Sequence, residues 1–276
     1  MRRAARLARL LAALAALGIA PPAAAQTPRA PDVAPAARSR YADHAIRAGG
    51  AELHYVEAGR GPPVVLVHGA LADYRVWDRQ IAALARRYRV VAYSRRDHSP
   101  NPWPDDGVSY TLAIHAGDLA ALITALRLGP VHLVAHSAGG AIAVQTALER
   151  PELIRSLVLV EPGLTGLVGG VPASVAFSRG AAAARDSFGA SLAAADTASA
   201  LRVFLDAVRG PGAYEGLSPE LRRVMFDNVG TLEAGAHGRA GHAATCEELR
   251  GLRAPVLLVG GDRSPALYGA ILDAAQ

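Results

Sequence analysis

Cysteine is almost absent from this chain of 276 residues, in which Cys246 stands alone. One thiol excludes an internal disulfide, and we interpret Cys246 as a small buried hydrophobic residue. Histidine, cysteine and carboxylate residues do not gather at metal-ligand spacing, so the sequence predicts neither a metal site nor another cofactor. An excess of basic charge is also missing from most of the chain, because the first 25 residues carry four arginines and no acid, and without them the formal net charge falls from +5 to +1. A nucleic-acid partner needs a basic excess in the folded part, so this class is excluded and a small-molecule substrate is predicted.

The N-terminus has a short apolar run and no long one. The basic stretch Arg2–Arg9, the apolar stretch Leu10–Ala20 and the small residues Ala23–Ala25 are together typical of a signal peptide over residues 1–25. A membrane span needs roughly 20 apolar residues, so no stable span is expected after processing, with a retained anchor as the alternative. We expect export to a periplasm or to the medium. Residues 26–40, rich in Pro, Ala and Arg, are predicted to form a flexible spacer.

From residue 41 onward, short apolar runs alternate with longer amphipathic segments. The expected strands are 42–48, 51–57, 64–67, 90–93, 131–135, 157–160 and 256–259, and the expected helices are 74–87, 111–126, 139–150 and 266–275. The later apolar runs are short, unbroken and rich in Val and Leu, as are strands buried on both faces of a parallel sheet. The series predicts an α/β fold with a doubly wound, mostly parallel sheet, formed by residues 41–161 and 255–276.

One long insertion interrupts this series. Residues 162–254 are rich in alanine and helical in character, without a convincing buried strand. A loop of this length is uncommon in a compact domain, so we interpret the segment as a helical cap over the carboxyl edge of the sheet, where it walls a pocket. A disordered insert is the alternative. Against it stands the apolar spacing of Phe204, Leu205, Val208, Leu221, Val224, Met225 and Phe226, which is enough to bury a helix face.

Ser137 is the candidate nucleophile. It follows the apolar run 131–135 after one residue, and a helix is expected to begin near Gly139. A nucleophile on so sharp a turn between strand and helix has a strained backbone, so its neighbours two residues away must be small. Ala135 and Gly139 meet this requirement, and the helix N-terminus favours developing negative charge. An ordinary serine in a glycine-rich turn is the alternative.

A second motif follows the apolar run 64–67, where the chain continues as His68-Gly69-Ala70. The backbone N–H groups of Ala70 and Ala138 are predicted to form an oxyanion hole, in which each donor is worth roughly 10²–10³ in rate. His68 has the chemistry of a general base, but we interpret it as a structural residue that shapes the turn. His136, next to the nucleophile, is also interpreted as structural. We assign His68, Gly69, Trp77 and His136 to the surroundings of the substrate pocket.

These motifs resemble the α/β-hydrolase superfamily, in its capped serine hydrolase form. The resemblance is carried by His68-Gly69, Trp77, the turn 93–96, Asp118 and the segment 135–139, and it covers roughly residues 42 to 275. It implies an eight-stranded, mostly parallel sheet and a triad of serine, acid and histidine. It also implies that Asp118 is structural. The usual first glycine of the nucleophile motif is Ala135 here, which is still small.

The acid of the triad has two candidates. The resemblance implies an acid after the seventh strand, where Asp262 stands, but the usual carboxylate position aligns with Ser264. Other members of the superfamily place the acid directly after the sixth strand, at the position of Glu161 in this sequence. A carboxylate there is able to orient a histidine and to stabilise its charged form. We prefer Glu161, with Asp262 and a simple ion-pairing role for Glu161 as alternatives.

The catalytic histidine is missing from its expected place. The resemblance implies a histidine after an eighth strand, and no histidine follows His242 in this sequence; His237 and His242 lie among Gly and Ala in the cap region. Removing the triad histidine of a serine protease costs about 10⁶ in turnover, so the chain as written should be nearly inactive and its seventh strand should be an open sheet edge. We interpret the sequence as truncated, without its last strand and helix; a pseudoenzyme is the alternative.

The sequence therefore predicts a serine hydrolase that acts on an ester, lactone or similar small apolar substrate through an acyl-enzyme. Haloalkane dehalogenases and epoxide hydrolases need a carboxylate where Ser137 stands, so they are not expected. A binding protein that has lost its base, and a cofactor-free haloperoxidase-like activity that uses the same triad, are the alternatives.

Overall fold

The computed structural model describes residues 39–103, 111–194, 196–232 and 244–276. The predicted signal peptide, nearly all of the predicted spacer, and both His237 and His242 lie outside these described residues. Among the helices that are described, none is long and apolar enough to cross a membrane.

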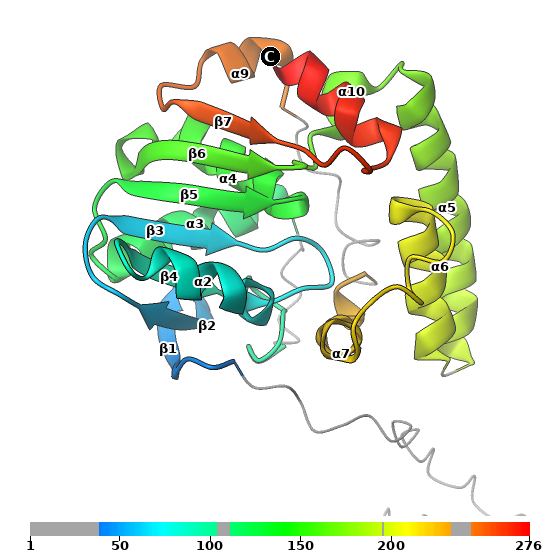
Figure 1. Cartoon of the computed structure of the whole chain (residues 1–276), viewed down its shortest axis with the longest axis horizontal. Helices are drawn as coiled ribbons and strands as arrows, with labels where there is room; N and C mark the ends of the chain where they lie inside the picture. Colours follow the sequence, from blue (N-terminus) through cyan, green and yellow to red (C-terminus); the bar gives the residue numbers. More distant parts are fainter. Residues whose placement is uncertain (1–38, 104–110, 195, 233–243) are drawn as a thin grey trace, which may run out of the picture. The chain divides into compact units, whose positions relative to one another are not determined.

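The fold is built on a sheet of seven strands in the order β1-β2-β4-β3-β5-β6-β7 (Figure 1). The strands are β1 (Asp43–Ala48), β2 (Ala51–Ala58), β3 (Pro63–Val67), β4 (Arg89–Tyr93), β5 (Val131–His136), β6 (Ile154–Val160) and β7 (Val256–Val259). β1 pairs antiparallel with β2, and β2 pairs antiparallel with β4. All other pairs are parallel, so the predicted α/β class with a mostly parallel sheet is confirmed.

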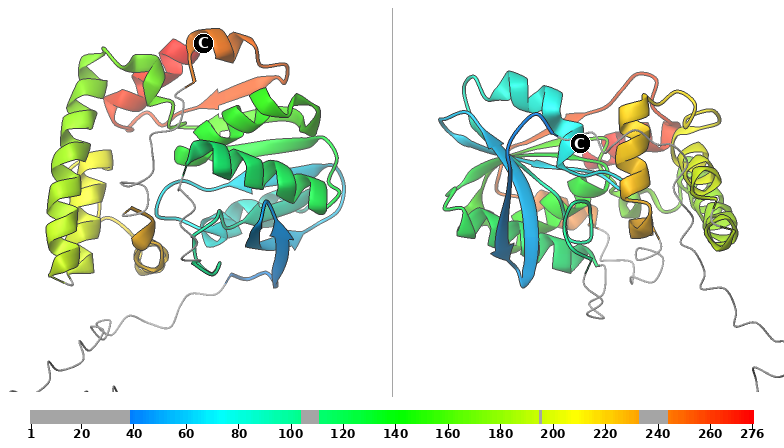
Figure 2. Two further views of the ribbon diagram at one scale, coloured as in Figure 1. Left: turned by 180° about the vertical axis from the view of Figure 1, so that it is seen from behind. Right: turned by 90° about the horizontal axis from the view of Figure 1, so that it is seen from below.

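The apolar runs supply both faces of the sheet. In β3, Val64 and Leu66 pack into one hydrophobic cluster, whereas Val65 and Val67 pack into the other. This alternation follows from the two-residue period of a strand, and it explains why both alternate positions of β3 are apolar. Helices therefore cover the sheet on both sides (Figure 2).

The helices follow the expected series. They are η1 (Tyr74–Trp77), α2 (Asp78–Leu84), α3 (Leu112–Ala125), α4 (Ala138–Glu149), η2 (Pro151–Leu153), η3 (Thr165–Val168), α5 (Pro172–Ala193), α6 (Thr197–Arg209), α7 (Pro219–Asp227), α9 (Cys246–Arg250) and α10 (Ala266–Ala275). Side chains cap several of their N-termini: Thr111 accepts from the Ile114 N–H, and Ser218 accepts from the Leu221 N–H. Asp118 on α3 binds Arg96 through both carboxylate oxygens at 2.8 Å, which is the structural role expected of it.

The described part of the insertion is helical, and α6 and α7 lie beyond the carboxyl ends of the strands (Figure 1). Leu71, from the loop after β3, packs with Leu201 and Leu205 of α6 and with Met225 of α7. An apolar cluster of this kind is what positions a cap over the sheet edge.

Among the described strands, β7 lies at one end of the sheet order, and three of its side chains are exposed: Val256 by 41%, Leu257 by 58% and Val259 by 37%. The helix before it corrects one expectation. Cys246 is exposed, because it is the first residue of α9, where a capping box formed by Thr245 and Glu248 sets the turn and no residue is buried. Its interpretation as a buried residue is wrong.

Candidate active site

Ser137 lies on a sharp turn between β5 and α4. Its backbone has φ 51° and ψ −123°, in a region that is strained for any residue with a Cβ. The strain is held by hydrogen bonds to the neighbouring strand and loop: the Ser137 N–H donates to Val160 O at 3.1 Å, and the N–H groups of Gly140 and Gly163 both donate to Ser137 O at 2.8 Å. The turn is therefore fixed to the end of β6.

The small residues around Ser137 are required by the close approach of the backbone. A Cβ on Gly139 would lie 2.5 Å from Val67 O and 2.6 Å from His68 O, which leaves no room for a side chain. Ala135 is completely buried. The predicted requirement for small residues two positions before and after Ser137 thus has a direct steric cause at Gly139.

Glu161 follows β6 at the same edge of the sheet as Ser137. Its backbone is also in the left-handed region, with φ 45°, and its N–H donates to Val259 O at 2.9 Å. The carboxylate oxygen Oε1 accepts hydrogen bonds from the Gly261 N–H at 3.3 Å and from the Ser264 hydroxyl. Ser264 and the Gly261 backbone thus hold the carboxylate of Glu161, the preferred candidate for the acid.

The second candidate acid is placed differently. Asp262 has a side chain that is 97% exposed, and its nearest charged neighbour is Arg263, with Nε 4.0 Å from Oδ1. The structure therefore brings Glu161, and not Asp262, to the cavity that contains Ser137.

The loop after β3 approaches Ser137 closely. A Cβ on Gly69 would lie 3.1 Å from the Cβ of Ser137 and 3.1 Å from His136 Nδ1. Ala70 lines the same cavity as Ser137, and Ala138 is the first residue of α4. In the described loops, turns and helix caps, neither the Ala70 nor the Ala138 N–H donates to a backbone carbonyl.

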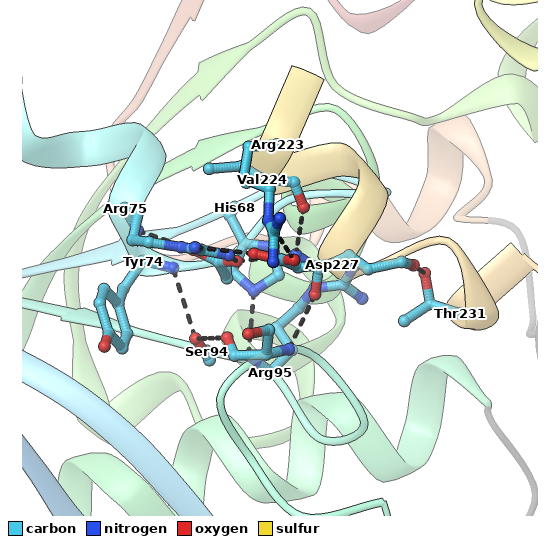
Figure 3. Close-up of polar contacts among 12 residues, drawn as sticks. His68, Tyr74, Arg75, Ser94, Arg95, Arg223, Val224, Asp227 and Thr231 are labelled. Carbon is cyan, nitrogen blue, oxygen red and sulfur yellow. Dashed lines mark hydrogen bonds and ion pairs between the residues drawn. The ribbon is translucent and has the colours of Figure 1, made fainter. Parts of the chain in front are cut away.

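His68 is fully buried behind this loop, and its two ring nitrogens are used (Figure 3). Nδ1 contacts Gly69 O at 2.9 Å, and Nε2 accepts from the Arg95 N–H at 2.9 Å. Burial, together with the charge of Arg95, holds the pKa of His68 well below its usual value, so the ring is neutral and shapes the turn. Its assignment to the substrate pocket is corrected, because His68 is completely buried and is not among the residues that line the cavity at Ser137.

The assignment of Trp77 to the substrate pocket is corrected for a related reason. It is 7% exposed and packs with Val64, Leu66 and Ile81 in the hydrophobic cluster between the sheet and α2. The 3₁₀ turn that carries it continues directly into α2, which directs the indole toward the sheet. Trp77 is thus a core residue and does not line the cavity around Ser137.

His68 belongs to a group of three neighbouring histidines, with His98 and His115, which we call the buried histidine cluster. The ring centroids of His68 and His98 are 4.7 Å apart, and those of His98 and His115 are 6.4 Å apart. For each of the three, burial and then the charge of Arg95 hold the pKa well below its usual value. The cluster is therefore neutral at pH 7.

A polar network, which we call the cap anchor, joins α7 to the loop after β3 (Figure 3). Arg75 binds Asp73 at 2.6 Å and Asp227 of α7 at 2.9 Å. Asn228 completes it by donating to Asp73 at 2.7 Å and by accepting from the Ser99 N–H at 2.8 Å. The Asp73 side chain is completely buried, so the network is shielded from water. Burial lowers the pKa of Arg75, but the carboxylates of Asp73 and Asp227 raise it by more, so Arg75 stays positively charged.

The cavity at Ser137 has a volume of about 220 Å³. The core contributes one part of the lining: Ala70, His136, Ser137, Glu161, Arg263, Ser264, Pro265 and Tyr268. The cap contributes the other: Phe204, Leu205, Val208 and Arg209 from α6, and Met225 from α7. The structure thus brings Ser137, Glu161, Ala70 and His136 to one place. Burial lowers the pKa of His136, the charge of Glu161 opposes this, and the charge of Arg209 adds to it.

Tyr268 of α10 is among the cavity residues that sequence reasoning missed. Tyr268 is 9% exposed and lines the cavity, where its hydroxyl interacts with Ser137. Burial raises the pKa of Tyr268, partly offset by this interaction, so the phenol stays protonated at neutral pH. No motif marks this tyrosine, because its contact depends on how α10 packs after β7.

A mostly parallel sheet, a strained serine between strand and helix, a glutamate after the next strand and a cap of helices together define the class of α/β proteins to which this fold belongs. The chain belongs to the alpha/beta hydrolase fold family, whose model matches residues 62–267.

Individual relatives are consistent with this family. The chain is 35% identical over 144 residues to a 2-hydroxy-6-oxo-6-(2'-aminophenyl)hexa-2,4-dienoic acid hydrolase of Metapseudomonas resinovorans, covering 51% of this chain and 48% of that one. It therefore spans about half the length of this relative. It is 26% identical to a 2-(acetamidomethylene)succinate hydrolase of Mesorhizobium japonicum, covering 86% of this chain and 83% of that one. An alpha/beta hydrolase structure from Sphaerobacter thermophilus superposes with a TM-score of 0.67 at 21% identity, over 84% of this chain and 87% of that one.

Proposed function

We propose that this protein is a serine hydrolase that cleaves an ester, lactone or similar small substrate through an acyl-enzyme. One observation carries the proposal: Ser137, on its strained turn, shares a cavity of about 220 Å³ with Glu161 and Ala70. Family membership and the hydrolase names of its relatives support the reaction type. The two curated relatives described above are named as hydrolases of organic acids, so the proposed range of substrates includes acids.

In the proposed reaction, Ser137 Oγ attacks the substrate carbonyl carbon and transfers its proton to a base. The N–H groups of Ala70 and Ala138 bind the oxyanion, and the alcohol leaves with the proton from the base. Water then attacks the acyl-enzyme by the same steps in reverse. The strained turn supports this role, because it presents the hydroxyl beside the positive end of α4.

The base in this proposal is a histidine that Glu161 orients. Among the described histidines, those of the buried histidine cluster lie in the interior of the protein. His132 hydrogen-bonds to Ser156 in the first half of β5. His136 is the described histidine that lines the cavity. It precedes Ser137 directly on the strand, and successive side chains of a strand leave it on opposite faces.

The test is hydrolysis of p-nitrophenyl butyrate by the native gene product, with a fluorophosphonate probe to label the nucleophile. We expect saturable hydrolysis and one label on the Ser137 peptide, both lost in Ser137→Ala. His136→Gln should keep at least a tenth of the activity. If it is instead as inactive as Ser137→Ala while still folded, His136 is the base. A folded native product with neither hydrolysis nor labelling would overturn the proposal in favour of a binding protein.

A further inference from the structure

The cavity at Ser137 is apolar on its cap side except for one cation. α6 contributes Phe204, Leu205 and Val208, and then Arg209 in its last turn. Arg209 is exposed to solvent, so its guanidinium is hydrated in the free protein and accessible to a ligand bound at this wall of the cavity. Such a position is stabilised by a ligand that carries the opposite charge.

The other charged residues of the cavity lining, Glu161 and Arg263, have different surroundings from Arg209. Glu161 accepts from Gly261 and Ser264, and Arg263 has a side chain that is 96% exposed, beside Asp262. Among the described residues, no acid forms an ion pair with Arg209. Its charge nevertheless acts on the interior of the cavity, since it lowers the pKa values of both His136 and Tyr268.

Resting on the proposed function, we propose that Arg209 selects substrates whose acyl part ends in a carboxylate. The carboxylate binds the guanidinium at the cap wall, and the reacting carbonyl lies against Ser137 at the core wall. The apolar side chains between them contact the methylene chain. Planar, bidentate pairing with a carboxylate is the interaction for which arginine is suited and lysine is less so.

An arginine in the last turn of a helix also interacts favourably with the helix dipole. That interaction affects the stability of α6 and gives no preference among substrates. A selectivity measurement therefore distinguishes the two roles. The suitable probes are mono-p-nitrophenyl esters of adipate, pimelate and suberate, in which the chain is long enough to limit attack of the carboxylate on its own ester. Each is compared with its methyl-capped, neutral counterpart, and Ser137→Ala protein supplies the blank rate.

We expect kcat/KM to favour the carboxylate over the methyl-capped ester for at least one chain length. Arg209→Gln should lower this ratio about 10-fold, and Arg209→Lys should lower it less, because a charge-assisted pair of this kind is lost or weakened. Arg202→Gln is the matched control. It removes the same charge from the same helix, but Arg202 binds Glu215 and does not line the cavity, so the ratio should not change.

A second measurement separates this inference from the proposed function. Binding of free adipate to Ser137→Ala protein is measured by calorimetry, with and without Arg209→Gln; we expect about 10-fold weaker binding in the double variant. If both esters are hydrolysed and Arg209→Gln leaves the ratio of the two kcat/KM values unchanged, the inference is overturned and the proposed function stands. If neither ester is hydrolysed but adipate binds through Arg209, the acyl-enzyme proposal fails and the anion site stands. If adipate does not bind and no ester is hydrolysed, both fail.

Discussion

Arg75→Met should destabilise the protein strongly, because Arg75 neutralises a carboxylate that has no access to water. Asp73 accepts hydrogen bonds from the Arg75 N–H at 3.0 Å, from Nε at 2.9 Å and from Nη2 at 2.6 Å. Methionine keeps the backbone bond and much of the apolar stem but removes both guanidinium bonds. The carboxylate would then be buried with Asn228 as its remaining side-chain donor.

Removing one partner of a buried ion pair costs about 3–5 kcal/mol, since the other charge is left uncompensated. A typical domain is stable by only about 5–15 kcal/mol. We therefore expect a loss of about 3–5 kcal/mol in the free energy of unfolding, measured by urea titration at pH 7.5. The thermal midpoint should fall by roughly 10 °C.

The double variant Asp73→Asn, Arg75→Met removes the stranded charge and should recover at least half of the loss. Arg202→Met serves as the control on the cap, because its pair with Glu215 is exposed to solvent, with side chains that are 43% and 55% accessible; its unfolding curve should overlay that of the wild type. An Arg75→Met protein within about 1 kcal/mol of the wild type would show that water reaches Asp73, and the reasoning from burial would be refuted.

Three further outcomes follow from the site. Gly139→Ala places a Cβ 2.5 Å from Val67 O, so we expect a loss of about 1–3 kcal/mol in unfolding free energy and a loss of fluorophosphonate labelling; normal labelling would contradict the close approach. Glu161→Gln keeps the shape of the acid but not its charge, and it should lower kcat for butyrate ester by at least about 10²-fold with KM nearly constant; an equal change in KM alone would point to a binding role. Burial depresses the pKa values of the three histidines in the buried histidine cluster. Below about pH 6.5, the usual pKa of a histidine, the unfolded chain therefore binds more protons than the folded protein does. Stability should be complete above that pH and should fall as the pH drops below it, by up to about 1.4 kcal/mol per pH unit for each ring; an unfolding free energy that is flat between pH 6.5 and 5 would contradict this.

The sheet could be predicted from the sequence because burial on both faces leaves a plain signature. β3, β4, β5 and β7 begin and end within one residue of their expected bounds. β6 begins at Ile154, three residues before the expected start, because Arg155 and Ser156 interrupt the apolar run; Ser156 still pairs with His132, while the register passes over Arg155 at an irregularity. Periodicity therefore finds the buried centre of a strand better than its polar end.

The site was only partly predictable. The turn at Ser137 requires small residues close to it in the sequence, so this part of the site can be recognised from the sequence alone. Loop side chains follow no period, which is why His68 was expected at the pocket and lies in the interior. The bond between Arg75 and Asp227 spans 152 positions, and the contact of Tyr268 with Ser137 depends on the packing of α10. Neither leaves a local pattern.

The cap anchor has a mechanical consequence. Asp73, which holds Arg75 and Asn228, is three residues from Ala70, so α7 is bound to the same short loop that carries a proposed oxyanion donor. A movement of α7 away from the sheet would pull on that loop, whereas a movement of α6 would not act through these bonds. Widening the cavity at α7 and keeping the donor aligned are therefore competing demands. Turnover by this protein is expected to be sensitive to any substrate bulky enough to press against α7.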